Sequence, residues 1–314
     1  MIDNKLEASI IHKLNLKLDG NVFYIKRDDL IPFSFGGNKA RKAFLFFKDL
    51  EKKKANCVVT YGSSSSNHCR IIANIAAAKK LPCYIISPNE TSQMTTNSKM
   101  INLFNAVVIK CPVDEVNVTI KRQLLELREK GFHPYFIQGG GHGNLGTEAY
   151  VDAYREIMEY ENSSGQYFDY IFHSSGTGTT QAGLICGNLL NHRKSKIIGI
   201  SIARKTIYGK QVILDSVNSY FKCIDENMIA SDNICFTDEY IVNGYGSYND
   251  DILKTIKESL IKDGVPLDAT YTGKAFWGMK KYIESNQIKD KRILFIHTGG
   301  TPLFFDELGE LNND

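Results

Sequence analysis

The feature that most constrains this chain is a regular alternation of short apolar runs with longer amphipathic stretches, from about residue 56 onwards. The apolar runs are rich in β-branched residues and read CVVTYG, PCYIIS, AVVIKC, HPYFIQ, YIFHSS, KIIGISI and RILFIHT. Near-continuous apolar strands separated by helices indicate a parallel sheet with helices on both faces. We therefore predict an α/β, doubly wound fold, in which ligands bind at the carboxyl ends of the strands.

The organisation between these runs is less regular. Helices are expected at about 113–130, 145–161 and from Thr180, whereas the stretch 208–233 carries no readable pattern. The glycine-rich passage 138–146 (QGGGHGNLG) is the best candidate for a hinge between two lobes.

Composition argues against several classes of function. The formal charge is +3 and cationic residues are interleaved with acidic ones, so nucleic acid is not expected as a partner. The N-terminus MIDNKLEASII has no apolar signal-peptide region, and no stretch approaches the ~20 apolar residues of a membrane span. The seven cysteines form no CxxC pair, which favours buried free thiols over disulfides or a zinc site. We expect a cytoplasmic protein with no membrane segment.

The segment GGNKARK, from Gly36 to Lys42, raises a question of electrostatics. Two glycines lead into a helix whose first turns carry Lys39, Arg41 and Lys42. A helix N-terminus already has positive dipole character, so cations there oppose the field. A solvated basic helix face is one interpretation. A functional role for Lys39 and Lys42 is the other, and the remaining motifs have to decide between them.

The strongest loop signal is SSGTGTTQAG, which follows the apolar run YIFHSS and opens a helix. Small residues and threonine hydroxyls at a helix N-terminus suit a phosphate. No GK[ST] follows, which excludes a Walker A loop, and Gln181 replaces the third glycine of a dinucleotide fingerprint. The alternative is a glycine-rich turn that packs a helix on a strand.

Two further loops carry hydroxyl groups. The serine run GSSSSNH precedes a helix and provides either redundant N-caps or donors for a carboxylate, and His68 alone would be a surface histidine of that helix. The segment DATYTGKA and the C-terminal turn HTGGT together could enclose a flat ligand from the side. The hydroxyl groups of either segment could equally serve only to stabilise the loop and have no ligand.

Taken together, KRDD…GGNKARK, GSSSSNHCR, SSGTGTTQAG, LDATYTGKA and FIHTGGTPLF resemble the pyridoxal-phosphate enzymes of the tryptophan-synthase-β fold. The match is to the branch of D-cysteine desulfhydrase and 1-aminocyclopropane-1-carboxylate (ACC) deaminase, and it spans about Val22 to Phe305. The resemblance implies two open, twisted, mostly parallel sheets flanked by helices. It also implies a small domain over 43–146, a large cofactor-binding domain over 1–42 and 147–314, pyridoxal phosphate as cofactor, and a homodimer.

The resemblance assigns cofactor contacts to these motifs. Lys39 would bind the cofactor covalently, and a helix start surrounded by cations lowers the pKa of its amine. Lys42 would reach the phosphate, and Asn67 the ring oxygen O3′. The phosphate loop would contain Thr177, Gly178, Thr179 and Thr180.

On the substrate side, the resemblance implies that Ser66, Asn67 and His68 hold the carboxylate of a small amino acid. Ser66 is also a candidate carrier of the Cα proton, a role that Lys39 could share. Tyr271 would lie against the cofactor ring, with Tyr245, in GYGSYND, as a second tyrosine of the active site.

Two positions discriminate within the branch. ACC deaminases carry a glutamate facing the pyridine nitrogen, whereas Thr272 here offers a neutral hydroxyl, and Thr298 likewise matches the desulfhydrase pattern. A ring that withdraws electrons weakly favours loss of a β leaving group over ring opening. The sequence departs from its relatives at Phe33, Phe35 and Ser65, all on the expected substrate side.

The expectation is therefore a pyridoxal-phosphate-dependent lyase that performs α,β-elimination on a small amino acid. D-Cysteine, giving pyruvate, ammonia and sulfide, is the first candidate. The alternatives are elimination or β-replacement on cysteate, diaminopropionate or an activated serine, and ACC deamination. A non-catalytic module that binds pyridoxal phosphate or a nucleotide is the rival from another class.

Overall fold

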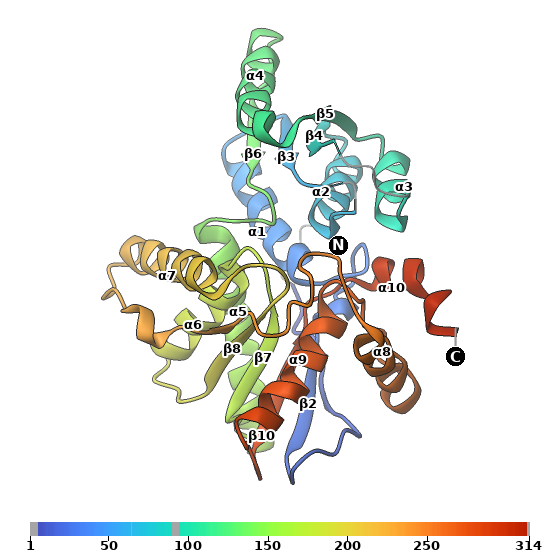
Figure 1. Cartoon of the computed structure of the whole chain (residues 1–314). Helices are drawn as coiled ribbons and strands as arrows, with labels where there is room; N and C mark the ends of the chain where they lie inside the picture. Colours follow the sequence, from blue (N-terminus) through green and yellow to red (C-terminus); the bar gives the residue numbers. More distant parts are fainter. Residues whose placement is uncertain (1–5, 64, 90–93, 313–314) are drawn as a thin grey trace.

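The computed structural model describes residues 6–63, 65–89 and 94–312, which form two lobes, each built on its own sheet (Figure 1). Residues 1–5 and Ser64 of the serine run lie outside the described residues. The larger sheet has the order β1-β2-β10-β7-β8-β9, with β1 antiparallel to β2 and every other pair parallel. Its strands are β1 (Ile11–Lys13), β2 (Val22–Arg27), β7 (Tyr170–Ser175), β8 (Lys196–Ser201), β9 (Cys235–Thr237) and β10 (Arg292–His297).

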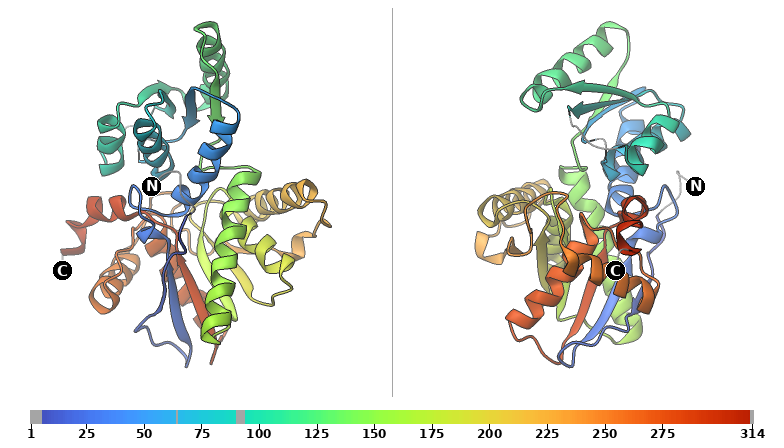
Figure 2. Two further views of the ribbon diagram at one scale, coloured as in Figure 1. Left: turned by 180° about the vertical axis from the view of Figure 1, so that it is seen from behind. Right: turned by 45° about the vertical axis from the view of Figure 1, so that its right-hand side comes forward.

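The smaller sheet is parallel throughout and has the order β5-β4-β3-β6. It occupies the upper lobe in Figure 1, and both views of Figure 2 show the same separation from the larger sheet. Its strands are β3 (Cys57–Tyr61), β4 (Cys83–Pro88), β5 (Val107–Cys111) and β6 (Pro134–Ile137). The two mostly parallel sheets confirm the predicted fold class.

Helices cover both faces of each sheet, and the strand pattern shows why. In β10, Ile293 and Phe295 point into a core shared with α8 and α9, whereas Leu294 and Ile296 point into a core shared with α5, α6 and α7. The helices are α1 (Asn38–Lys52), α2 (Asn67–Ala78), α3 (Thr96–Leu103), α4 (Val116–Glu129), α5 (Asn144–Ser164), α6 (Thr179–Leu190), α7 (Thr206–Cys223), α8 (Asp250–Asp263), α9 (Thr272–Ser285) and α10 (Thr301–Glu307).

Two elements differ from the prediction. The stretch without a readable pattern contains α7, an 18-residue helix. Its exposed positions include the large apolar residues Ile207 and Tyr208, so the alternation of polar and apolar residues does not show which face is buried. The helix expected from residue 113 begins with a 3₁₀ turn, and α4 itself starts at Val116. The predicted domain boundaries, 43 and 146, fall inside α1 and in the first turn of α5, and that division stays a prediction.

The cysteines agree with the expectation of free thiols. Five are buried, Cys235 is half-buried and Cys223 is exposed, and none of the seven forms a disulfide. No helix in the described part of the chain is long and apolar enough to cross a membrane.

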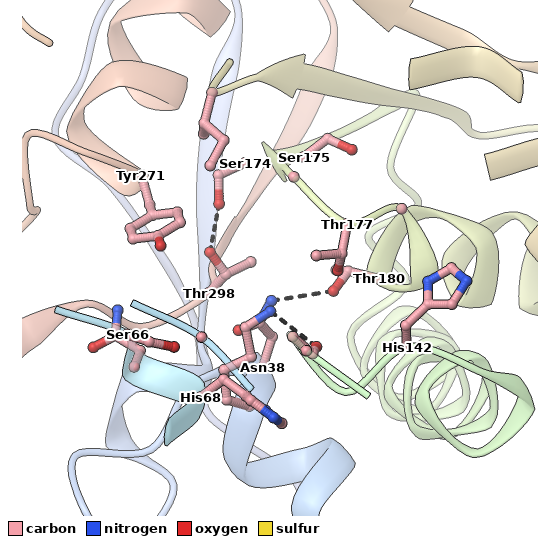
Figure 3. Close-up of a pocket in the computed structure, with 18 of the residues that line it drawn as sticks. Asn38, Ser66, His68, His142, Ser174, Ser175, Thr177, Thr180, Tyr271 and Thr298 are labelled. Atoms are coloured by element: carbon pink, nitrogen blue, oxygen red, sulfur yellow. Dashed lines mark hydrogen bonds between the residues drawn. The ribbon is translucent and has the colours of Figure 1, made fainter. Parts of the chain in front are cut away.

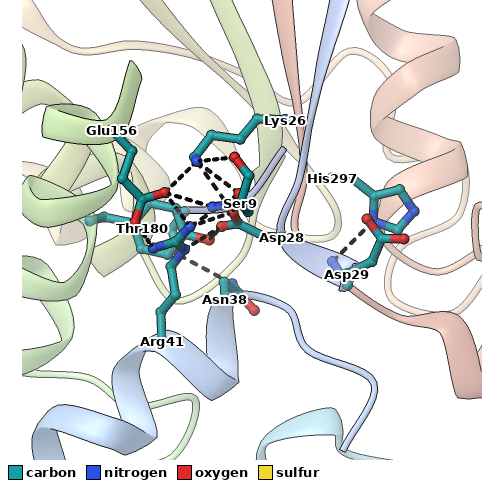
Figure 4. A network of polar contacts seen from close by, with 11 residues as sticks. Ser9, Lys26, Asp28, Asp29, Asn38, Arg41, Glu156, Thr180 and His297 are labelled. Atoms are coloured by element: carbon teal, nitrogen blue, oxygen red, sulfur yellow. Dashed lines mark hydrogen bonds and ion pairs between the residues drawn. The ribbon is translucent and has the colours of Figure 1, made fainter. Parts of the chain in front are cut away.

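A buried network of charges joins α1 to the larger lobe (Figure 4). Arg41 donates to both carboxylate oxygens of Asp28 at 2.8 Å and to both oxygens of Glu156 at 2.6 and 2.7 Å. Lys26 donates to Glu156 and to the hydroxyl of Ser9. Burial alone would raise the pKa of the Asp28 carboxyl, but the charges of Arg41 and Lys26 hold it well below its usual range. The network therefore fixes the start of α1 against β2 and α5.

Replacing the central cation should destabilise the fold strongly. Arg41→Leu leaves the buried Asp28 and the partly buried Glu156 carboxylates facing a single lysine, and the free energy of unfolding should fall by about 3 to 5 kcal/mol. Urea denaturation checks this. Arg122→Leu, which removes an exposed pair with Glu126 at 3.9 Å, is the matched control and should cost less than about 0.5 kcal/mol. Equal losses from the two variants would contradict the assigned role.

Candidate active site

A pocket of about 590 Å³ opens between the two lobes. It is lined where five parallel strands end, by Tyr61 in β3, Gln138 after β6, Ser175 in β7, Ile202 after β8 and Thr298 after β10. These are the carboxyl ends of the strands, as the doubly wound pattern predicts. The N-termini of α1, α2 and α6 meet at the same place, so unpaired backbone N–H groups and positive dipole ends converge there.

Most of the residues expected in an active site come together in this pocket (Figure 3). Those that line it are Lys39, Ser66, Asn67, His68, Thr177, Gly178, Thr180, Tyr245 and Tyr271. Lys42 and Thr179 lie directly behind the lining, and Thr272 lies elsewhere.

Lys39 and Lys42 resolve the question raised by the basic helix start, because neither belongs to a solvated face. Lys42 is 1% exposed, and its Nζ donates to the hydroxyl of Thr179 at 2.8 Å. Loss of solvent lowers the pKa of Lys39 to about 8, and burial together with the Lys39 charge lowers the pKa of Lys42 well below its usual value. Among the described residues no carboxylate compensates either amine. The charges of these two amines therefore favour binding of an anion at this site.

The N-terminus of α6 offers the place for that anion. Gly178 precedes the helix with φ of 96°, which leaves the first N–H groups of α6 free of side chains and turned towards the pocket. The Nδ2 of Asn38 donates to Thr180 Oγ1 at 3.1 Å and so ties the start of α1 to this loop. Gln181, where a dinucleotide fingerprint has glycine, instead packs against Gly199 in β8.

Asn67 is oriented by two donors from outside the pocket. Its Oδ1 accepts from Asn97 Nδ2 at 2.9 Å and from Arg70 Nη2 at 3.5 Å. Because the carbonyl oxygen is held on that side, the amide N–H₂ is left to face the pocket as a donor. This orientation suits the hydrogen bond to a ring oxygen that the resemblance implies.

The start of α2 forms the second anion position. Ser66 is the N-cap, and its hydroxyl accepts from the N–H of Cys69, so the N–H groups of Asn67 and His68 remain for a ligand. The motif alone suggested that His68 lies on the helix surface, but the residue is only 2% exposed. The Thr60 hydroxyl donates to the carbonyl of Ile137, so His68 Nε2 must donate to Thr60 Oγ1.

The imidazole of His68 is consequently locked and uncharged. Burial, followed by the charges of Lys39 and Lys42, lowers its pKa well below the usual value. His68 can therefore contribute its backbone N–H to a carboxylate, while its ring supports β3.

Two tyrosines close the pocket on one side. Their hydroxyl oxygens are 2.6 Å apart, and the rings of Tyr245 and Tyr271 are T-shaped with centroids 5.9 Å apart. Burial, followed by the influence of Tyr245, raises the pKa of Tyr271 well above its usual value. The raised pKa keeps the Tyr271 hydroxyl protonated, which suits a wall of the pocket or a proton donor.

Thr272 does not line the pocket, which corrects the expectation that its hydroxyl faces the cofactor ring. The side chain is fully buried, its Oγ1 donates to Asp268 Oδ1 at 2.7 Å, and it accepts from the Asp268 N–H at 3.0 Å. The Asp268 carboxylate accepts hydrogen bonds from the backbone N–H groups of Tyr271 and Thr272 at the start of α9, and the same carboxylate draws the Thr272 hydroxyl back towards residue 268. The neutral hydroxyls at this end of the pocket belong to Thr298 and Ser174, whose oxygens are 2.6 Å apart.

Several pocket residues received no role from the sequence. Asn38 and Ser174 stand inside the quoted motifs, so their proximity to the assigned residues was the available signal. His142 and Arg204 lie in loops whose approach to the pocket depends on the tertiary fold. Asn97 acts from α3 and has no local signal at all.

Comparisons with known proteins agree with this geometry. The profile of the family described as pyridoxal-phosphate dependent enzyme matches residues 10–299. A crystal structure of an ACC deaminase homologue is 26% identical, with a TM-score of 0.87 over 97% of this chain and 93% of that one.

Two more distant structures show the fold. A hydrogen sulfide-producing enzyme from Fusobacterium nucleatum is 17% identical, with a TM-score of 0.66 over 93% of this chain and 95% of that one. O-Acetyl serine sulfhydrylase isoform 3 from Entamoeba histolytica is 15% identical, with a TM-score of 0.70 over 98% and 90% of the two chains.

The residues of the pocket fit pyridoxal phosphate. The uncompensated Lys42 and the α6 N-terminus suit its phosphate, Lys39 its aldehyde, and the Asn67 amide its ring oxygen. The contacts assigned to individual residues remain predictions.

Substitution at Gly178 tests the phosphate position. A β-carbon there would lie 3.0 Å from Val212 Cγ1, at a φ that disfavours any side chain, so Gly178→Ala measures the steric cost alone. Gly178→Asp adds a carboxylate beside the phosphate, and pyridoxal phosphate should bind on the order of a hundredfold more weakly than to the alanine variant. Equilibrium dialysis measures both. Equal affinities would show that the loop does not hold the phosphate.

Proposed function

The chain belongs to the pyridoxal-phosphate-dependent enzyme family, and from that premise we propose that it is a lyase acting on a small amino acid with a β leaving group. The reaction is α,β-elimination, and D-cysteine is the first candidate. With water it would give pyruvate, ammonia and hydrogen sulfide. The observation that carries the proposal is the absence of any carboxylate among the described residues that line the pocket.

The lack of a carboxylate bears on the electronics of the reaction. When bound, pyridoxal phosphate supplies an electron-withdrawing ring that stabilises negative charge at the Cα of an amino acid. The hydroxyls of Thr298 and Ser174 hold no charge that would keep a pyridine nitrogen protonated. Short-lived charge at Cα favours immediate departure of a β substituent, which supports elimination over ring opening.

The remaining groups supply positioning and proton transfer. The N–H groups at the start of α2 would hold the substrate carboxylate, on the same side of the pocket as the Tyr245–Tyr271 pair (Figure 3). Lys39, whose pKa of about 8 leaves part of the amine neutral near pH 7, would take the Cα proton. Its Nζ now donates to the carbonyl of Gly140 at 3.1 Å, within the same pocket.

A pyruvate-release screen tests the reaction. The purified protein should release pyruvate from one or more D- or L-amino acids with a thiol, sulfonate, amino or acylated hydroxyl group at Cβ, and it should not process ACC at a comparable rate. Lys39→Ala should abolish turnover. The urea concentration at its unfolding midpoint should equal that of the wild type, because the Lys39 side chain has no ion-pair partner among the described residues.

Other outcomes of this screen would redirect the proposal. Efficient ACC turnover would favour the deaminase reaction and refute the argument from the hydroxyls. Consumption of the amino acid only when a second nucleophile is present would identify β-replacement.

Two isosteric threonine-to-valine variants distinguish a role of Thr298 in the reaction from a structural role of Thr272. Thr298→Val should change the proportion of pyruvate to side products such as those of transamination, because it alters the pocket end. Thr272→Val should leave that proportion unchanged and lower the free energy of unfolding by about 1 to 2 kcal/mol, since buried Asp268 loses a hydrogen bond. Product analysis and urea denaturation give the two readouts, and the reverse pattern would restore Thr272 to the site.

A further inference from the structure

His142 lies beside the phosphate loop without a role in the reaction described above. It stands between β6 and α5 in the glycine-rich passage and lines the pocket together with Thr177 and Gly178. Figure 3 shows it on the same side as Thr177 and Thr180, whereas Ser66 and Tyr271 lie on the other side of the pocket. The imidazole therefore belongs to the phosphate side rather than to the substrate side.

The groups that face His142 are cationic. Loss of solvent lowers its pKa, the charges of Lys42 on α1 and Arg204 after β8 lower it further, and a hydrogen bond with the Thr177 backbone raises it in part. No acidic side chain lines this pocket among the described residues. Burial and the two cations thus favour the neutral imidazole, and a dianion placed beside His142, Lys42 and Arg204 would favour its protonated form.

We propose that His142 is a proton-linked ligand of the cofactor's phosphate: neutral when the site holds no dianion, and protonated when it does. The proton comes from solvent and adds to the free ring nitrogen, so the cation forms beside the phosphate oxygens without any other bond changing. The proposal rests on the cofactor of the family and not on the lyase reaction.

The proton linkage has a defined sign. If the imidazolium is stabilised by the phosphate, binding of pyridoxal phosphate takes up a proton at His142. Affinity is then highest at low pH and falls as the pH rises through the pKa of His142 in the loaded protein. Above that pKa the contribution of His142 to affinity disappears.

The ³¹P resonance of the holoenzyme tests this directly, because it reports the surroundings of the phosphate and does not depend on substrate turnover. In the wild-type holoenzyme the resonance should move with a midpoint between about pH 6 and 9. His142→Gln should remove that transition. His133→Gln, the same change at an exposed histidine outside the pocket, is the matched control and should keep it.

Two further measurements guard against a merely structural effect. Arg204→Gln leaves His142 intact but removes a cation, so the midpoint should move to higher pH. The dissociation constant of pyridoxal phosphate should rise about tenfold in His142→Gln at pH 6.5 and less than twofold at pH 9.5. Superimposable ³¹P titrations of wild type and His142→Gln, or equal weakening at both pH values, would overturn the proposal.

Discussion

The rest of this structure depends on Lys39 and Lys42, two amines withdrawn from solvent with no compensating carboxylate among the described residues. Burying an uncompensated ammonium is costly, and the pKa values of Lys39 and Lys42 fall accordingly. Both point towards the pocket, three residues apart on one face of α1. The helix dipole of α1 adds to the cost. An anion bound among the converging helix N-termini would offset all of these costs at once.

The same helix is held rigidly on its other side. Arg41 stands between the two lysines in sequence but points away from them, and its guanidinium is fully engaged by Asp28 and Glu156. One face of α1 is therefore fixed by compensated charges, while the other presents uncompensated amines. Within the four residues from Lys39 to Lys42, Arg41 therefore attaches α1 to the larger lobe, while Lys39 and Lys42 face the binding pocket.

The sequence allowed the fold and much of the pocket to be predicted, since strand periodicity and strand-end motifs are local signals. Lys39, Asn67 and Gly178 line the pocket because each stands at a helix start that follows a strand or loop end. The prediction that Thr272 faces the cofactor ring was wrong because a nearby residue, Asp268, binds its hydroxyl, and sequence spacing carries no information on that hydrogen bond. His142 could not be foreseen because its approach to the pocket depends on the tertiary fold, and Asn97 could not because its contact with Asn67 depends on how α3 packs against α2.

The turn before α1 shows what this arrangement requires of the backbone. Ser34, Phe35, Gly36 and Gly37 all have positive φ, at 49°, 59°, 52° and 89°. The two non-glycine residues are strained in this region. Arg70, buried on α2 with a pKa lowered to about 9 by desolvation, donates to the carbonyl and hydroxyl of Ser34.

A single guanidinium thus connects the strained turn to the substrate side, because Arg70 also contacts the Oδ1 of Asn67. The glycines complete the turn: a β-carbon on Gly37 would lie 2.7 Å from the carbonyl oxygen of Thr298. The start of α1 consequently packs directly against the end of β10, where the Asn38 N–H donates to the carbonyl oxygen of Thr298 at 2.9 Å. Lys39 follows directly, so its position is determined by the contacts of the preceding turn with Arg70 in the smaller lobe and Thr298 in the larger one, rather than by its own side chain.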